Sequence, residues 1–291
     1  MTPIGQKFGP GRSASDGREL VELYLVTVEG LFRSIAIHSC YRLEFSPRKI
    51  FDWSLIMSLT ISRNAGFWSR FEERVAPFNL LQHPFYQAWS KGELTREDLR
   101  EYAAEYWHHV SAFPTYLSAL HSRLPDGEMR REVLRNLAEE EGVDAATARP
   151  HSDLWMDFAA GMGASRGEVE GRAVQPEMTA LMATFRELMQ EEKASAAMAA
   201  LYAYESKVPA IAATKAEGLA EHYGTEGAAA RYFTLHQTAD VAHASVWREL
   251  IDKQLAGALE DEEAALAAGE RAAKALWVAL DGVERQRTSV N

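Results

Sequence analysis

Hydrophobic and polar positions follow the period of an α-helix from about residue 67 onward. Apolar side chains recur every three or four residues over long stretches, as amphipathic helices require. Strand-like alternation is missing from the sequence, and no repeat of fixed period appears. The pattern predicts an all-α bundle of seven or eight helices.

Capping and breaking residues set the expected helix boundaries. Thr95 and Asp98 form a variant of the capping box, which predicts a helix from there to about Arg123. A longer helix over 194–223 contains Pro209, where we expect a kink. The other expected helices span 125–142, 151–162, 176–192, 226–255 and 260–283.

The first part of the chain has a different character. Glycine, serine and arginine interrupt residues 1–65, and no helical period persists there beyond 19–32. We interpret 1–65 as an N-terminal extension that is poorly ordered, or as upstream sequence read from an early start codon, with Met57 as a later candidate start. The helical domain is expected to cover residues 66–291.

Composition and charge exclude several classes of function. The net charge is −11, which argues against nucleic acid or an anionic membrane as the main partner. The single cysteine, Cys40, excludes an internal disulfide and a cysteine-based zinc site. The sequence has no signal-peptide pattern and no apolar run of the ~20 residues that a membrane span needs. We expect a cytoplasmic protein.

The segment YFTLHQTADVAHASVW, residues 232–247, places polar side chains on a helix face that should be buried. Steps of three and four residues align Phe233, His236, Asp240, His243 and Trp247. Each polar residue alone is more simply a hydrogen-bonded core residue. Together they favour a metal, because burying a carboxylate costs several kcal/mol and a divalent cation offsets that cost better than imidazoles do.

Other buried carboxylates and histidines extend this candidate site. Glu205 lies within an apolar stripe over 198–209, although a Lys or Arg partner would also explain it. Glu140 follows two leucines at three-residue steps in an acidic run that could be a solvated turn, and His151 begins the next helix. The total of three carboxylates and three histidines suits a di-iron or iron–manganese site inside a bundle.

The ferritin arrangement fits this chain poorly. It needs two Glu-x-x-His motifs, and the sequence contains one, Glu105 to His108. We interpret the remaining histidines as structural or pocket-lining residues: His83, His108, His109, His121 and His222.

Four sequence blocks resemble one family of proteins. They are LLQHPFYQAWSKGELTREDLREYAAEYWHHVSAFPTYLSALHSR, NLAEEEG with HSDLW, ALYAYESKVPAIAATKAEGL and YFTLHQTADVAHASVW. In order and spacing they resemble the chlamydial protein associating with death domains and its bacterial relatives, which are haem-oxygenase-like dimetal oxidases related in fold to thiaminase II and the pyrroloquinoline quinone oxidase. The resemblance covers about 67–256 and implies that fold.

The resemblance also implies six metal ligands. Carried over by motif, they are Glu140, His151, Glu205, His236, Asp240 and His243. The loop between Glu140 and His151 is longer than in the family. Glu139, Glu141 and Asp144 therefore stay open as replacements for Glu140.

An unusual reaction is implied as well. The branch resembles oxygen-dependent p-aminobenzoate synthases of folate biosynthesis, in which the protein's own tyrosine supplies the ring and a lysine supplies the nitrogen. The matching residues here are Tyr86 as ring donor, Tyr102 near the site, Lys215 as amine donor, and Tyr204 and Tyr232 in the pocket. From the residue pattern alone, Lys215 would be an exposed lysine and the tyrosines ordinary core aromatics.

We therefore expect an oxidase with two metal ions, iron–iron or iron–manganese, that uses molecular oxygen and an unidentified external electron donor. One alternative is a multi-turnover dimetal oxidase of a small amine, amino acid or fatty acid. Another is a helical protein-interaction module without activity. Thiaminase-like hydrolysis is disfavoured because Cys40 lies outside the matching region. A homodimer is expected for this fold.

Overall fold

The computed structural model describes residues 64–143, 149–190, 193–255 and 259–290. Regular structure within these residues is entirely helical, which confirms the all-α prediction. The predicted extension falls almost entirely on 1–63, outside the described residues, so that prediction stays untested. No helix in the described part of the chain is long and apolar enough to cross a membrane.

In the described residues, a first helical segment at 64–75 is followed by ten α-helices, whereas seven or eight helices were expected. They are α3 (Pro84–Ser90), α4 (Arg96–Arg123), α5 (Glu128–Glu140), α6 (His151–Gly161), α7 (Arg166–Glu170), α8 (Pro176–Gln190), α9 (Ala194–Glu205), α10 (Val208–Tyr223), α11 (Arg231–Leu255) and α12 (Leu259–Val290). Short 3-10 helices η1 (Ala76–Phe78) and η2 (Leu80–Gln82) precede α3, and η3 (Gly227–Ala230) precedes α11. The short helices α3 and α7 lack the long apolar period that sequence analysis relies on.

The predicted kink at Pro209 is wrong in detail. The chain breaks between the end of α9 at Glu205 and the start of α10 at Val208, so 194–223 forms two helices. Pro209 lies in the first turn of α10, where its missing N–H would have had no helical partner. Proline therefore begins a new helix here instead of bending a continuous one.

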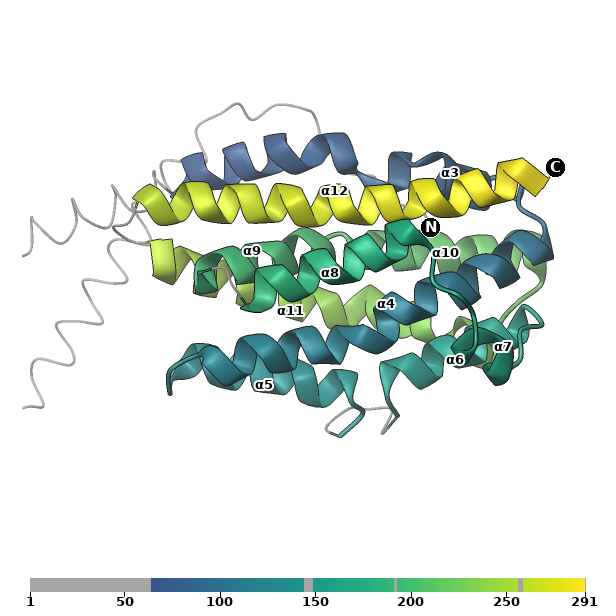
Figure 1. Cartoon of the computed structure of the whole chain (residues 1–291), viewed down its shortest axis with the longest axis horizontal. Coiled ribbons are helices and arrows are strands. Elements are labelled where there is room, and N and C mark those ends of the chain that lie inside the picture. Colours follow the sequence, from purple (N-terminus) through teal and green to yellow (C-terminus); the bar gives the residue numbers. More distant parts are fainter. Residues whose placement is uncertain (1–63, 144–148, 191–192, 256–258, 291) are drawn as a thin grey trace, which may run out of the picture. The chain divides into compact units, whose positions relative to one another are not determined.

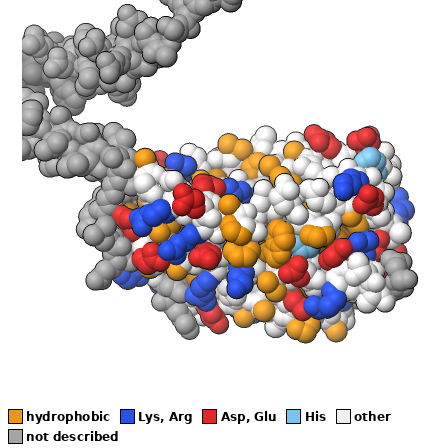
Figure 2. Space-filling model, turned by 90° about the horizontal axis from the view of Figure 1, so that it is seen from above, with side chains coloured by type: hydrophobic (Ala, Val, Ile, Leu, Met, Phe, Trp, Pro, Cys, Tyr) orange, Lys and Arg blue, Asp and Glu red, His pale blue; other side chains and the backbone are white. Residues whose placement is uncertain are grey.

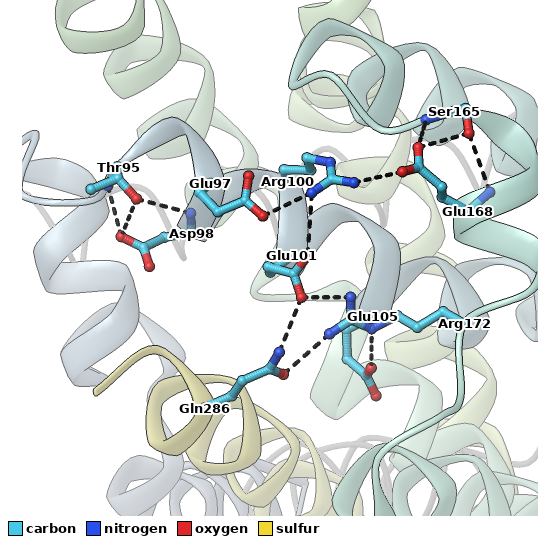
Figure 3. Close-up of polar contacts among 10 residues, drawn as sticks. All are labelled: Thr95, Glu97, Asp98, Arg100, Glu101, Glu105, Ser165, Glu168, Arg172 and Gln286. Carbon is cyan, nitrogen blue, oxygen red and sulfur yellow. Dashed lines mark hydrogen bonds and ion pairs between the residues drawn. The ribbon is translucent and has the colours of Figure 1, made fainter. Parts of the chain in front are cut away.

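The predicted capping box at the start of α4 is confirmed. The Thr95 hydroxyl accepts a hydrogen bond from the Asp98 N–H at 3.0 Å, and the Asp98 carboxylate accepts one from the Thr95 N–H at 2.8 Å. Figure 3 shows this reciprocal pair. It fixes the start of the helix that carries Tyr102.

Helix α9 occupies the centre of the packing and presents mostly small side chains. It packs against α8, α11 and α12, and the long α12 runs beside it in Figure 1. Alanines fill much of α9, and they are almost completely buried, so the neighbouring helices approach its backbone closely. Glu205, the last residue of α9, is thereby held deep inside the bundle.

Candidate functional site

The six predicted ligands lie in two groups of three. Glu140, His151 and His236 form the first triad, and Glu205, Asp240 and His243 form the second triad. Within each triad, one ligand atom from each residue lies within 4.8 Å of the others. The side chains come from α5, α6, α9 and α11, and all six are at most 9% exposed. The helical spacing on α11 brings three of them to one buried face, as predicted.

The first triad is preorganised by contacts to the backbone and between rings. His151 Nδ1 lies 3.0 Å from Glu140 Oε2. His236 Nδ1 lies 2.7 Å from the Tyr232 carbonyl oxygen and donates to it, which leaves Nε2 as the ring nitrogen with a free lone pair. Burial would raise the pKa of Glu140, but the facing imidazoles outweigh burial and lower it.

The second triad places one imidazole among several carboxylates. His243 Nδ1 lies 3.3 Å from Asp240 Oδ1 and 3.6 Å from Glu205 Oε2. Burial would lower the pKa of His243, but the carboxylates of Asp240, Glu205 and Glu139 raise it to about 10. The negative charge of these carboxylates therefore favours a cation at this place.

Two further side chains hold Glu205. Trp247 Nε1 donates to Glu205 Oε2 at 2.8 Å, and Asn136 Nδ2 lies 3.2 and 3.4 Å from the two carboxylate oxygens. These donors limit the directions in which the Glu205 carboxylate can turn. Sequence analysis aligned Trp247 with the ligands but assigned it no role, and it missed Asn136. Asn136 precedes Glu140 by four residues, so its position on the same helix face was the available signal.

Glu139 is a second residue whose role the sequence did not reveal. Its Oε2 lies 2.9 Å from His243 Nε2, on the side of the ring opposite to Asp240. Glu141, another candidate replacement for Glu140, is exposed, and Asp144 lies outside the described residues. The structure therefore places Glu140 with the ligands and Glu139 behind one of them.

The donor set fits a pair of metal ions. Asp240 Oδ2 is buried and has no hydrogen-bond partner among the described residues. Burial raises the pKa of the Glu205 carboxyl to about 8. Such groups are costly without a cation, and carboxylates mixed with imidazoles are ligands that iron and manganese accept.

Lys215 lies in a separate part of the site, the lysine pocket, which it forms with Tyr86 and Tyr102. The Lys215 side chain is buried, contrary to what its residue pattern alone suggested. Its Nζ donates to the Tyr86 hydroxyl at 2.8 Å and to the Tyr102 hydroxyl at 2.6 Å, and these two hydroxyls are 3.1 Å apart. Burial lowers the pKa of Lys215 well below its usual value, so the amine is held closer to its neutral, nucleophilic form.

Two small cavities lie beside the lysine pocket and the triads and share part of their lining. Tyr86 and Lys215 line the inner cavity of about 20 Å³, and four of the triad residues line a second cavity of about 10 Å³. Tyr204, Val208 and Tyr232 line both. Each cavity has room for about one water molecule. The predicted pocket tyrosines thus lie between the triads and the lysine pocket.

Glu105 of the incomplete ferritin motif and two of the histidines interpreted as structural, His109 and His83, lie outside the triads. Glu105 accepts a hydrogen bond from Arg172 Nε at 2.9 Å (Figure 3). It also accepts one from the Gln175 N–H at 2.9 Å. His109 is fully buried among aromatic rings, and burial lowers its pKa to about 3. His83 caps α3 by accepting the Phe85 N–H at 3.2 Å. These contacts agree with the structural interpretation.

Comparisons with known proteins identify the family. A family model described as iron-containing redox enzyme matches residues 100–277. The 4-aminobenzoate synthase of Nitrosomonas europaea is 43% identical over 215 residues, which cover 70% of this chain and 85% of that protein. The 4-aminobenzoate synthase of Chlamydia pneumoniae is 37% identical over 206 residues, which cover 71% and 89%.

Solved structures show the same fold. A TenA homologue from Pseudomonas syringae pv. tomato has a TM-score of 0.63 at 21% identity and covers 75% of this chain and 93% of its own. A domain with a heme oxygenase-like fold from Shewanella denitrificans has a TM-score of 0.61 at 16% identity and covers 80% and 93%. A CADD-like protein of unknown function from Nostoc punctiforme has a TM-score of 0.63 at 14% identity and covers 78% and 99%. The chain belongs to the family of iron-containing redox enzymes, has the haem-oxygenase-like fold, and is similar in sequence to these 4-aminobenzoate synthases.

Proposed function

We propose that this protein makes p-aminobenzoate for folate biosynthesis from its own side chains, with Tyr86 as the source of the ring and Lys215 as the source of the nitrogen. The observation that carries the proposal is the contact of Lys215 Nζ with the Tyr86 hydroxyl at 2.8 Å inside a buried pocket. Relatives named 4-aminobenzoate synthase support the product.

The skeleton of tyrosine accounts for the product atom by atom. The tyrosine ring with Cβ has the seven carbons of p-aminobenzoate, and the hydroxyl stands opposite Cβ as the amine stands opposite the carboxylate. The Cα–Cβ bond of Tyr86 breaks and Cβ is oxidised to the carboxylate. At the other end, the phenol oxygen leaves as water and the ring carbon binds Lys215 Nζ. Two-electron oxidation and hydrolysis of the Cε–Nζ bond leave Cε as an aldehyde, and Cα takes up a hydrogen so that glycine stands at position 86. Two molecules of dioxygen accept eight electrons, six from the two side chains and two from an external donor.

The geometry favours Tyr86 over Tyr102 as the ring that is consumed. Both hydroxyls contact Lys215, but Lys215 Nζ lies 4.3 Å from the Tyr86 ring centre and 4.9 Å from that of Tyr102. Tyr86 also lines the inner cavity, which Tyr102 does not. We assign Tyr102 to holding Lys215, because it accepts the shorter hydrogen bond.

The two triads are the proposed metal ligands. Iron–iron or iron–manganese bound by them would supply the one-electron chemistry with dioxygen that side chains lack. The chain's own residues bind and orient: Asn136 and Trp247 hold Glu205, and the Tyr232 carbonyl holds His236. Tyr204 and Tyr232 limit the space between the triads and the lysine pocket to two cavities of about 20 and 10 Å³.

A multi-turnover oxidase of a small molecule is the second reading of the same ligands. It needs space for a substrate, and ordinary ligand pockets measure roughly 300–1,000 Å³. The two cavities beside the triads and Lys215 measure about 10 and 20 Å³. The small internal volume therefore supports side chains of the protein as the substrate.

Isotope labelling separates the two functions. Protein containing ring-¹³C tyrosine and side-chain-¹⁵N lysine is treated with iron, a reductant and oxygen in the presence of unlabelled free amino acids. Both labels should appear in p-aminobenzoate, as measured by mass spectrometry. Unlabelled product would show that the ring and nitrogen come from added molecules. Failure of the iron-supplemented protein to hold metal would instead favour the interaction-module alternative.

A further inference from the structure

We propose that the product leaves through a groove beside η1 and η2, and that Leu80 is the gate between this groove and the inner cavity. The proposal rests on the function proposed above, because it assigns a route to the aromatic carboxylate formed there. The groove, called the exit groove here, measures about 300 Å³ and is formed by η1, η2, the end of α9 and the middle of α12.

The product cannot leave without an opening. The inner cavity holds about 20 Å³, and a benzene ring with two substituents is several times larger than the one water that fits there. Tyr86 is 3% exposed and Lys215 is 5% exposed, so the reacting atoms have no direct path to solvent. Some side chain in the cavity wall must therefore move.

Two side chains are shared by the inner cavity and the exit groove. Leu80 and Tyr204 line both spaces. Because the Leu80 side chain lines both spaces, a change of its rotamer would connect them. Leu80 lies in a short 3-10 helix between irregular residues, where local movement disturbs few helical hydrogen bonds.

A second large groove is a poor exit, although it is also close to the lysine pocket. This acidic groove of about 380 Å³ shares no lining residue with the inner cavity. The Phe85 ring separates it from the pocket, 5.0 Å from the Tyr102 ring. One guanidinium, that of Arg287, and four carboxylates line it: Glu97, Asp98, Glu101 and Glu105. Figure 3 shows them fixed in the helix cap and in contacts with Arg100 and Arg172. They would repel an aromatic carboxylate.

The chemistry of the exit groove suits the product better. Most of its lining is apolar, and it contains one lysine, Lys207, and one carboxylate, Glu72. The Lys207 Nζ contacts Glu72 Oε2 at 2.8 Å, with both side chains partly exposed, and such pairs exchange at little free-energy cost. Figure 2, which views the molecule from above the orientation of Figure 1, shows hydrophobic side chains gathered between charged ones on that face. A ring can lie on the apolar wall while its carboxylate meets Lys207.

The test compares retained with released product in the full chain. Wild type, Leu80→Trp, Leu80→Ala and Leu81→Ala are each loaded with iron and given reductant and oxygen. Product is then measured twice, after denaturation and in the filtrate of a rapid spin. Leu81→Ala is the matched control, because Leu81 lines the exit groove but not the inner cavity.

The expected result is a change in release and not in formation. Relative to total product, release should slow about tenfold or more in Leu80→Trp, as for a step limited by gate opening, and quicken in Leu80→Ala. Leu81→Ala should release like wild type. If both Leu80 variants release product at the wild-type rate, Leu80 is not the gate. If Leu80→Trp does not fold, the release rate of Leu80→Ala alone decides whether Leu80 is the gate. Absence of product after denaturation in all four proteins would overturn the proposed function, and the exit with it.

Discussion

The two halves of the site bury polar groups in opposite ways. The triads place carboxylates against imidazoles, and opposite charges raise the pKa of His243 and lower that of Glu140. The lysine pocket holds an amine against two phenols, where burial lowers the pKa of Lys215 and raises that of Tyr86. One half is organised to accept cations, and the other keeps its groups uncharged. A metal oxidant and a neutral nucleophile can thus exist side by side in one bundle.

The largest effect on product yield is expected from tyrosine substitutions in the lysine pocket. Tyr86→Phe should reduce the p-aminobenzoate yield to background, because the ring then lacks the oxygen that nitrogen replaces. Tyr102→Phe, the matched variant, should keep a measurable yield since it removes only a hydrogen bond to Lys215. Chromatography of the denatured reaction measures both. Full yield from Tyr86→Phe would contradict the assignment of the ring donor.

Removing a ligand charge should weaken metal binding at the triads and leave the lysine pocket unchanged. Asp240→Asn keeps the size of the side chain but loses the buried carboxylate, so metal content per chain should fall, with affinity reduced at least about 10–100-fold. Elemental analysis after iron supplementation measures this. Glu249→Gln, an exposed position on the same helix, is the control. Unchanged metal content in Asp240→Asn would remove Asp240 from the ligand set.

A smaller effect on metal binding is expected at Glu139, whose carboxylate contacts His243 Nε2. Glu139→Gln replaces the acceptor that orients the imidazole from its outer nitrogen, and should weaken metal binding by roughly tenfold. Glu141→Gln, two residues further and exposed, should bind metal like wild type. Equilibrium titration with iron(II) or manganese(II) compares them. Equal weakening in both variants would point to general loss of negative charge.

We expect the difference in stability between Lys215→Met and wild type to depend on pH, because burial lowers the pKa of the Lys215 amine. Lys215→Met should be more stable than wild type at pH 7, because it removes an amine that burial holds neutral. The unfolded chain binds a proton on Lys215 below its ordinary pKa and the folded chain does not, so wild-type stability rises with pH. The gap should close between pH 7 and 9 by up to about 1.4 kcal/mol per pH unit.

Denaturant unfolding at several pH values measures this gap, with Lys207→Met as the control at a partly exposed lysine. A gap that stays constant with pH would show that Lys215 is protonated in the folded protein.

Most residues of the two triads could be predicted from sequence for a physical reason. Helical spacing alone aligned His236, Asp240 and His243, and an apolar stripe pointed to Glu205, so local periodicity carries most of the second triad. The choice of Glu140 over its acidic neighbours depended on how α5 packs. Periodicity could also not reveal that the helix expected over 194–223 divides at Glu205.

Local sequence patterns could not indicate the residues of the lysine pocket. Lys215 meets Tyr86 across 129 residues of sequence and Tyr102 across 113, and an amine between two phenols leaves no charge pattern along the chain. Only the family resemblance indicated these residues before the fold brought them together. The contact of Glu139 was likewise invisible, because polar residues near a helix end are usually solvated, whereas Asn136 could have been found from its place on the helix face of Glu140.

The central claim is that the protein consumes its own side chains, and peptide mass analysis tests it most directly. The iron-loaded protein is exposed once to reductant and oxygen, digested, and its peptides are compared with those of an anaerobic sample. The account predicts at most one p-aminobenzoate per chain, loss of the ring and Cβ at residue 86, and loss of the amine at Lys215. Unchanged peptides with product accumulating beyond one per chain would contradict it.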